Sequence, residues 1–285
     1  MTEILNNTVV ITSLSLSFIA FLAGVALYYA AKVFAVEEDP LVEEVDEALP
    51  GTNCGACGVP GCLSFAEKIV KTKDMSMYCP VGGQDVANEI ADIIGLEAIE
   101  QDKMVARVMC LGGNHSTRTG EYKGIKSCNA VSTVHQYDLT CSYGCFGYGD
   151  CVTSCEFDSI HIIDGVAVVD EEKCTACDAC VVECPIDIIE MQPYDKTVFI
   201  ACKSLDAGGA VKKYCTVGCT GCKKCVKACE HEAIAFDSFL ATIIPDKCTN
   251  CNDCVDKCDT DTIVISNKGI VEIKETMLHN AEVNV

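Results

Sequence analysis

The sequence contains no tryptophan, and aromatic residues make up only 6% of its 285 residues. A large conventional core is therefore not expected, because aromatic side chains contribute much of the area that such cores bury. Basic residues are also scarce, since 21 lysines and arginines stand against 42 acidic residues, for a formal net charge of −21. Binding to nucleic acid requires a basic surface, so we expect no nucleic acid partner.

The sequence also lacks the patterns of nucleotide sites and of sites built on histidine. Gly147-Tyr148-Gly149 has neither the rest of a dinucleotide-binding motif nor its setting between a strand and a helix. We therefore expect the chain to bind neither flavin nor NAD. The histidines show no metal-ligand spacing, and surface or packing roles are expected for them. They are His115, His135, His161, His231 and His279.

Cysteine, by contrast, is abundant, with 24 residues or about 8% of the chain. Such a content indicates either a disulfide scaffold or metal binding. Disulfide-rich proteins are usually short and secreted, whereas this chain is longer and its cysteines fall in tight runs. Cysteines two or three residues apart on one loop face a common object. They suit a metal centre better than bridges between distant loops.

A long apolar stretch lies near the N-terminus, where residues 9–31 carry no charge. A helix of this length reaches about 35 Å, enough to cross a bilayer core of about 30 Å. A cleaved signal peptide would need a basic start, but the only charge before the stretch is Glu3. We therefore expect residues 1–35 to be a retained anchor that crosses the cell membrane once. Lys32 places the remaining chain on the cytoplasmic side.

The next region, residues 36–100, is expected to be a small helical domain that holds one [4Fe-4S] cluster. An acidic link over 36–48 leads to Cys54, Cys57, Cys62 and Cys79, which follow the spacing C-x2-C-x4-C-x16-C. Apolar residues at helical spacing predict helices over 64–72 and 84–96. Zinc prefers two well-separated cysteine pairs, whereas three cysteines close together and a distant Cys-Pro fit a cubane better.

Three runs of cysteines beyond residue 105 have the spacing of bacterial ferredoxins. In two-cluster ferredoxins the first three cysteines of a run hold one cluster and the fourth holds the other. The second and third runs are therefore expected to exchange their fourth members, Cys229 and Cys258. The runs are Cys174, Cys177, Cys180 and Cys184; Cys219, Cys222, Cys225 and Cys229; and Cys248, Cys251, Cys254 and Cys258.

These runs belong to an internal repeat with an offset of 74 residues. The offset relates each cysteine of the first set to one in the second. The first set is Cys128, Cys141, Cys145, Cys151, Cys155, Cys174, Cys177, Cys180 and Cys184. The second set is Cys202, Cys215, Cys219, Cys225, Cys229, Cys248, Cys251, Cys254 and Cys258. We expect two tandem ferredoxin-like (βαβ)2 units, residues 105–200 and 201–285, with strands such as 160–163 and 262–265.

The two copies differ at one ligand position, because Tyr148 stands where the second copy has Cys222. The cluster of Cys145, Cys151 and Cys184 therefore lacks one standard ligand. The neighbouring set of Cys155 with Cys174, Cys177 and Cys180 is complete in its pattern.

Four clusters can be assigned from spacing alone, and eight cysteines remain for two more. In one partition Cys141 completes the deficient cluster, and Cys110, Cys128, Cys202 and Cys215 hold the sixth. In the other, Cys110 completes it, and the repeat-related pairs Cys128/Cys141 and Cys202/Cys215 hold the sixth. We favour the first, since Cys141 is nearest in sequence. Alternatively, some of these residues are simply buried thiols. Six clusters are expected, and at least four.

The whole arrangement resembles the family of B subunits of Rnf complexes, which oxidise ferredoxin and translocate ions. The resemblance covers nearly the whole chain and includes the GTNCGACGVPGC segment beside an anchor, RVMCLGG and two ferredoxin-like units. It implies a redox subunit of a ferredoxin-oxidising oxidoreductase, which takes electrons from reduced ferredoxin and passes them to other membrane and redox subunits. The expected fold class is α+β, built from small iron–sulfur domains behind one transmembrane helix.

Two alternative functions would use the same cysteines, and the lysines near them suggest a site for a partner. A stand-alone polyferredoxin would carry the same clusters without needing an anchor, and a structural zinc or disulfide protein would be colourless. Five lysines lie near the cysteines of the second copy, and a basic rim there would attract an acidic ferredoxin. The alternative for these lysines is ordinary solvation. They are Lys212, Lys213, Lys223, Lys224 and Lys227.

Overall fold

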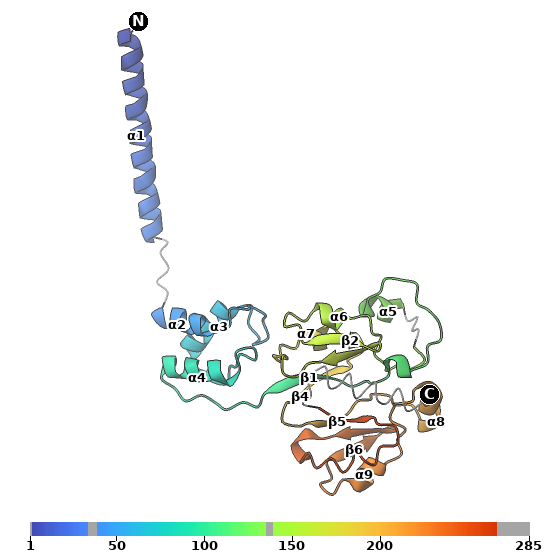
Figure 1. Ribbon diagram of the computed structural model, residues 1–285. Coiled ribbons are helices and arrows are strands. Elements are labelled where there is room, and N and C mark those ends of the chain that lie inside the picture. Colours follow the sequence, from blue (N-terminus) through green and yellow to red (C-terminus); the bar gives the residue numbers. More distant parts are fainter. Residues whose placement is uncertain (1, 34–38, 135–138, 267–285) are drawn as a thin grey trace.

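The computed structural model of the chain describes residues 2–33, 39–134 and 139–266. The end of the predicted anchor, the start of the acidic link, residues 267–285 of the second ferredoxin-like unit, His135 and His279 therefore lie outside the described residues. In chain order, the described part contains a long helix, a small helical domain and two mixed units (Figure 1).

The first helix, α1 (Thr2–Val33), contains the apolar stretch that the sequence places near the N-terminus. Residues 10–32 have a mean hydropathy of 2.2, and none of this stretch is buried against the rest of the protein. Figure 1 shows α1 extending away from the other elements. Its length and composition make it one candidate membrane-spanning helix.

Three short helices form the helical domain: α2 (Pro40–Ala48), α3 (Cys62–Thr72) and α4 (Gly83–Ile94). Asp39 caps α2, since its carboxylate accepts the Leu41 N–H at 3.0 Å, and Pro40 occupies the first turn. The helices pack around a small core that includes the fully buried Phe65 and Ile90. The helices predicted over 64–72 and 84–96 are present as α3 and α4.

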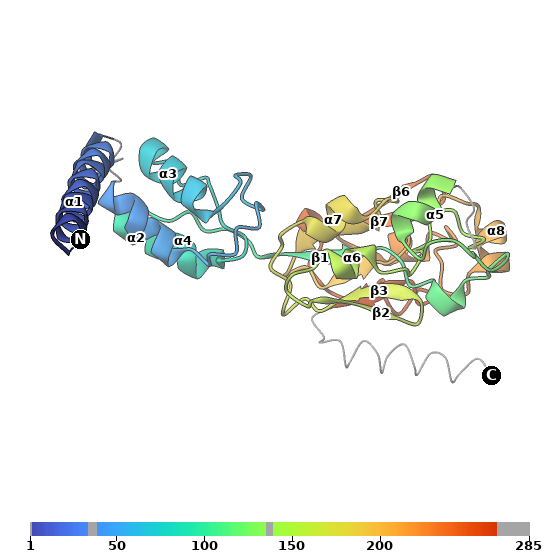
Figure 2. The same cartoon turned by 90° about the horizontal axis from the view of Figure 1, so that it is seen from above.

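The first ferredoxin-like unit contains two antiparallel two-stranded sheets. One sheet pairs β1 (Met104–Val108) with β4 (Ile189–Pro193), and the other is the hairpin of β2 (Ile160–Ile163) and β3 (Val166–Val169). Its helices are short. They are α5 (Cys128–Val134), α6 (Asp150–Thr153) and α7 (Ala179–Glu183), with a 3-10 turn at Gly113–His115. Figure 2 views these elements from above.

The second unit repeats the same arrangement. One sheet pairs β5 (Val198–Ile200) with β8 (Ile263–Ile265), and a hairpin joins β6 (Ile234–Asp237) to β7 (Leu240–Ile243). The helices are α8 (Gly208–Tyr214) and α9 (Lys224–Ala228), with a 3-10 turn at Pro245–Lys247. Because β5 pairs with β8, the unit begins shortly before the expected boundary at residue 201.

A buried ion pair lies between the two units. Arg107 on β1 is only 1% exposed, and its Nε lies 2.9 Å from Oε1 of Glu171. The second unit contributes to the same network, since the Ser266 hydroxyl donates to Glu171 and the Arg107 guanidinium lies 5.2 Å from the centre of the Phe199 ring. Each charge is thus compensated where water is excluded, as buried charges require.

Candidate metal centres

The first group of cysteines lies around α3: Cys54 and Cys57 are on the loop before it, Cys62 is its first residue, and Cys79 is on the loop after it. The Asn53 carboxamide oxygen accepts the Cys62 N–H at 2.8 Å, which folds the loop back on itself. Burial raises the pKa of the Cys79 thiol, and the nearby thiolates of Cys57 and Cys62 raise it further. Cys54 is exposed. Burial raises the pKa of the Cys177 thiol in the first ferredoxin-like unit, and the nearby Cys54 thiolate raises it further. This group therefore borders the next one.

The exchange of fourth cysteines is visible in both ferredoxin-like units. In the first, Cys180 is surrounded by Cys174, Cys177 and Cys155, and burial with their repulsion raises its pKa to about 12. In the second, one cavity is lined by the group Cys219, Cys222, Cys225 and Cys258.

Next to it lies Cys254, which interacts with Cys248 and Cys251. Cys229 packs in the same buried cluster as Cys248 and Cys254, and its sulfur accepts the Ala233 N–H at 3.4 Å. This is the grouping that the spacing of a two-cluster ferredoxin predicts.

Beside the deficient group of the first unit lies a cysteine that neither partition assigned to it. Cys128 lines one cavity together with Cys145, Cys151 and Cys184. Burial raises the pKa of the Cys151 thiol to about 12, and the nearby Cys128 thiolate contributes to this rise. Cys141, which the sequence favoured for this position, lines a different cavity, which Cys145 of the deficient group also borders.

The segment that carries Cys128 is held in place by Asp150 at the start of α6. The Asp150 carboxylate accepts the Ser127 hydroxyl at 2.8 Å and the Asn129 N–H at 3.0 Å. These two bonds flank Cys128 on either side. They fix the beginning of α5 over the backbone of residues 148–150, whose N–H groups contact the Cys128 sulfur.

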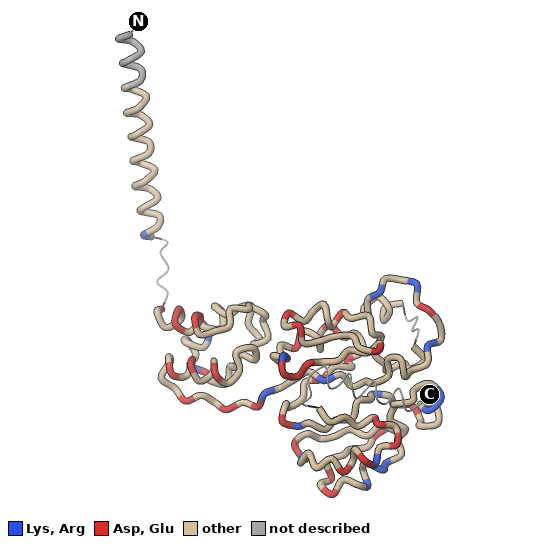
Figure 3. Tube along the Cα trace, in the orientation of Figure 1, with Lys and Arg blue, Asp and Glu red and all other residues tan. Residues whose placement is uncertain are grey.

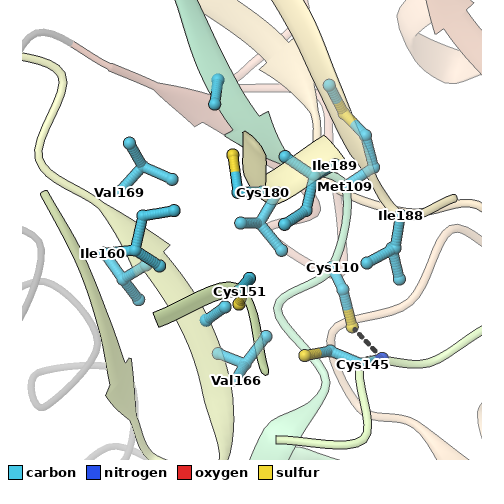
Figure 4. Close-up of a cluster of buried hydrophobic side chains, with 14 of the residues drawn as sticks. Met109, Cys110, Cys145, Cys151, Ile160, Val166, Val169, Cys180, Ile188 and Ile189 are labelled. Carbon is cyan, nitrogen blue, oxygen red and sulfur yellow. Dashed lines mark hydrogen bonds between the residues drawn. The ribbon is translucent and has the colours of Figure 1, made fainter. Parts of the chain in front are cut away.

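The last four cysteines lie together at the junction of the two units. Cys110, Cys141, Cys202 and Cys215 line one cavity between segments of both copies. Figure 4 shows Cys180, Cys151, Cys145 and Cys110 one after another across the core of the first unit, with the Cys145 N–H directed at the Cys110 sulfur.

The electrostatics of these groups call for a positive partner. Burial and neighbouring thiolates raise the pKa of Cys145 to about 12, and burial raises that of Cys202 to about 12. Without a cation such thiols stay protonated at neutral pH, whereas a coordinating metal stabilises the thiolate.

The spacing of the thiols bears on which metal would fit. Among the residues that the structure describes, no three His, Cys, Asp or Glu side chains are close enough to share one metal ion. A tetrahedral zinc, with bonds of about 2.3 Å, would need sulfurs about 3.8 Å apart. In a cubane each thiolate binds a different iron, so wider spacing fits a [4Fe-4S] cluster better.

Two buried hydroxyls support the same fit. Within the described ranges, Ser116 Oγ and Thr175 Oγ1 are the buried side-chain oxygens that have no hydrogen-bond partner. Ser116 lines the junction cavity, and Thr175 follows Cys174 in the ferredoxin run. An unpaired buried hydroxyl is costly, and sulfur atoms of a cluster would accept these two bonds.

The five lysines do not form one patch. Lys212 and Lys213 end α8, whereas Lys223, Lys224 and Lys227 lie on and before α9. Figure 3 shows separate basic stretches along the backbone near α8 and α9, among many acidic positions. Lys224 pairs with Asp259 at 2.6 Å, and the Lys223 ammonium lies 4.2 Å from the centre of the Phe236 ring. The α9 lysines adjoin Cys222, which is exposed.

Comparisons with known proteins agree with these cysteine groups. Family models match three segments: an Fe-S cluster family over residues 49–81, a 4Fe-4S binding domain over 167–190 and a 4Fe-4S dicluster domain over 218–262. The chain is 39% identical over 249 residues to the B subunit of an ion-translocating oxidoreductase complex from Methanosarcina acetivorans. That alignment covers 87% of this chain and 93% of the relative.

Two bacterial relatives carry more specific names. The B subunit of a Na⁺-translocating ferredoxin:NAD⁺ oxidoreductase complex from Acetobacterium woodii is 40% identical, over 79% of this chain and 68% of the relative. The B subunit of a proton-translocating ferredoxin:NAD⁺ oxidoreductase complex from Clostridium ljungdahlii is 36% identical, over 83% of this chain and 84% of the relative.

Proposed function

The chain belongs to the family of B subunits of ion-translocating (Rnf) oxidoreductase complexes, and we propose that it accepts electrons from reduced ferredoxin and relays them toward the membrane subunits of such a complex. Its part in the oxidoreductase is electron transfer. Each [4Fe-4S] cluster, when bound, supplies a one-electron carrier whose potential the surrounding hydrogen bonds adjust. The observation that carries the proposal is the order in which the cysteine groups lie.

Five groups of four cysteines are the proposed ligand sets. Three lie in the helical domain and the first unit: Cys54, Cys57, Cys62 and Cys79; Cys155, Cys174, Cys177 and Cys180; and Cys128, Cys145, Cys151 and Cys184. Two lie in the second unit: Cys219, Cys222, Cys225 and Cys258; and Cys229, Cys248, Cys251 and Cys254.

Electrostatic interactions between nearby thiols link neighbouring groups. Cys54 adjoins Cys177, and Cys151 adjoins Cys180, which links the helical domain to the first unit and the two groups of that unit to each other. Cys225 adjoins Cys254 in the second unit. The groups therefore form two series, and the helical domain, next in the chain to α1, ends one of them.

Exposure indicates where electrons would enter and leave. Cys54, Cys222 and Cys251 are exposed, whereas each cysteine of the first unit is buried or half-buried. Exposed ligands thus occur in the helical domain, within one series, and in the second unit, which forms the other series. We place ferredoxin at the second unit, near Cys222 and the α9 lysines, and the membrane partners near the helical domain.

We propose that α1 contacts the lipid bilayer and holds the cluster-bearing domains at the cytoplasmic face. The apolar stretch and Lys32 at its end support this orientation, because basic residues remain on the cytoplasmic side. The relatives from Acetobacterium woodii and Clostridium ljungdahlii are named for ferredoxin and NAD⁺ as well as for different translocated ions. Their common name supports ferredoxin as the electron donor of this chain too.

The test is to purify the complete chain without oxygen, measure iron and sulfide, and titrate it with reduced ferredoxin while recording EPR spectra. We expect about four irons and four sulfides per ligand set, with signals that appear at low potential. A preparation with zinc or disulfides in place of iron would contradict the proposal. Co-purification with polytopic membrane subunits would distinguish it from a stand-alone polyferredoxin.

A further inference from the structure

Four cysteines outside the five proposed ligand sets share one cavity. Cys110 and Cys141 come from the first unit, and Cys202 and Cys215 come from the second. The matched family segments cover residues 49–81, 167–190 and 218–262, and they contain none of these four cysteines. Each of these thiols is buried or half-buried, although the groups on either side already have four sulfurs each.

The two pairs are related by the internal repeat, although not in the way that the sequence offset indicates. The Cys145 N–H lies 3.5 Å from the Cys110 sulfur, and the Cys219 N–H lies 3.4 Å from the Cys202 sulfur. Cys145 and Cys219 are repeat mates, 74 residues apart. Cys110 is thus the structural equivalent of Cys202. Each copy contributes one equivalent pair to the cavity.

Backbone pairing between the copies fixes the other two cysteines. Ser116 pairs with Cys215 in an antiparallel bridge, and the Thr117 N–H donates to the Tyr214 carbonyl at 2.7 Å. On its other edge the same segment receives the Thr140 N–H at the Thr117 carbonyl, at 3.0 Å, one residue before Cys141. One short segment therefore holds Cys141 and Cys215 on its two sides.

The donors around the cavity are those of an iron–sulfur site. The lining residues of this described cavity include no carboxylate and no imidazole, so thiols are its only strong metal ligands. Gly112 N–H donates to the Cys110 sulfur at 3.2 Å, in addition to the Cys145 N–H. Ser116 Oγ is buried there without a partner. Backbone donors directed at thiolates are the usual surroundings of a cluster, and the Ser116 hydroxyl is free to donate to it.

We propose that Cys110, Cys141, Cys202 and Cys215 hold a further [4Fe-4S] cluster that the two copies share. The proposal rests on the proposed function in requiring that the sulfurs of this chain bind iron. Cys110 adjoins the group of Cys145, and Cys202 adjoins the group of Cys219. The shared site therefore joins the two series of cysteine groups into one unbroken series of six.

The experiment measures iron and sulfide in the complete chain, purified without oxygen, for the variants C110S, C202S and C110S/C202S. If both residues bind one cluster, each single variant loses about four irons and four sulfides, and the double variant loses no more than either. S204A is the matched control, because it alters the same cavity without removing a sulfur, and it should retain all the iron. A double variant that loses about eight irons, or single variants that lose none, would overturn the proposal.

Two further measurements keep the test decisive if C110S/C202S does not fold. The pair C141S and C215S, with its double variant, should give the same non-additive loss. The unmodified chain should contain about 24 irons, whereas about 20 would mean that these four thiols bind none. Absence of iron from the unmodified chain would instead contradict the proposed function itself, so the two failures are distinct.

Discussion

The Cys128 sulfur contacts the backbone N–H of Tyr148, the residue whose repeat mate in the second unit is Cys222. The first unit thus has Tyr148 in place of a cysteine in its ferredoxin run, and Cys128 reaches the same group from a separate segment. Asp150 holds that segment on both sides of Cys128, through the Ser127 hydroxyl and the Asn129 N–H. In the proposed ligand set, α5 therefore supplies the thiol that the run lacks at residue 148.

This replacement predicts a rescue. In C128S the group of Cys145, Cys151 and Cys184 loses its fourth thiolate, so the chain should lose up to four irons or show the EPR signal of a three-iron cluster. Adding Y148C should restore the iron, because it returns the cysteine that the second unit has at this position. Iron analysis with EPR of C128S and C128S/Y148C measures both effects.

The matching control is Y148C alone, which should keep the same number of irons, since Cys128 already fills the site. If C128S retained every iron and its EPR spectrum were unchanged, Cys128 would not be a ligand. In that case the thiol would be buried beside the group without taking part in it.

Much of the site follows from local spacing. The helical domain, the ferredoxin runs and the exchange of fourth cysteines depend on residues close in sequence or on a fixed repeat. The offset of 74 residues relates Cys141 to Cys215 correctly in structural terms, because no insertion separates them from the runs. It misassigns Cys128 to Cys202, because Cys128 lines the cavity of the first unit and Cys202 lines the one that both copies share.

Contacts between distant segments could not be predicted in the same way. Arg107 lies in a strand whose other residues are buried or half-buried, and a charged residue there would be expected to face solvent. Its partner Glu171 is 64 residues away, and Ser266 of the other unit completes the network. Nothing local in the sequence indicates that these three side chains meet.

That network predicts a large effect on stability. R107M would leave the Glu171 carboxylate buried without its partner, at a cost of about 3–5 kcal/mol. The double variant R107M/E171L removes both charges and should recover most of this loss. The measurement is the temperature at which the cluster absorbance bleaches, because unfolding of a multi-domain cluster protein is not two-state. Equal bleaching temperatures for R107M and the unmodified chain would contradict the prediction.

The unpaired hydroxyl of Ser116 predicts a shift in potential without loss of iron. A hydrogen bond to sulfur favours the more negative, reduced cluster, so S116A should lower the potential of the shared cluster. A bond worth about 1 kcal/mol corresponds to about 40 mV for one electron. T175A should act in the same way on the group of Cys174. EPR-monitored redox titration measures both, and potentials that stay unchanged in both variants would show that the hydroxyls do not bond to the clusters.

The α9 lysines predict how ferredoxin approaches. Reversing Lys223 and Lys224 to glutamate should slow reduction of the chain by ferredoxin, most strongly at low salt, because screening weakens attraction between exposed charges. Loss of the exposed Lys224–Asp259 pair should change stability little. K212E/K213E on α8 is the matched control, since it changes the net charge equally on a different helix. Stopped-flow reduction at several salt concentrations measures the rates. Equal slowing by both double variants would indicate a general charge effect, and no slowing by K223E/K224E would remove α9 as the docking site.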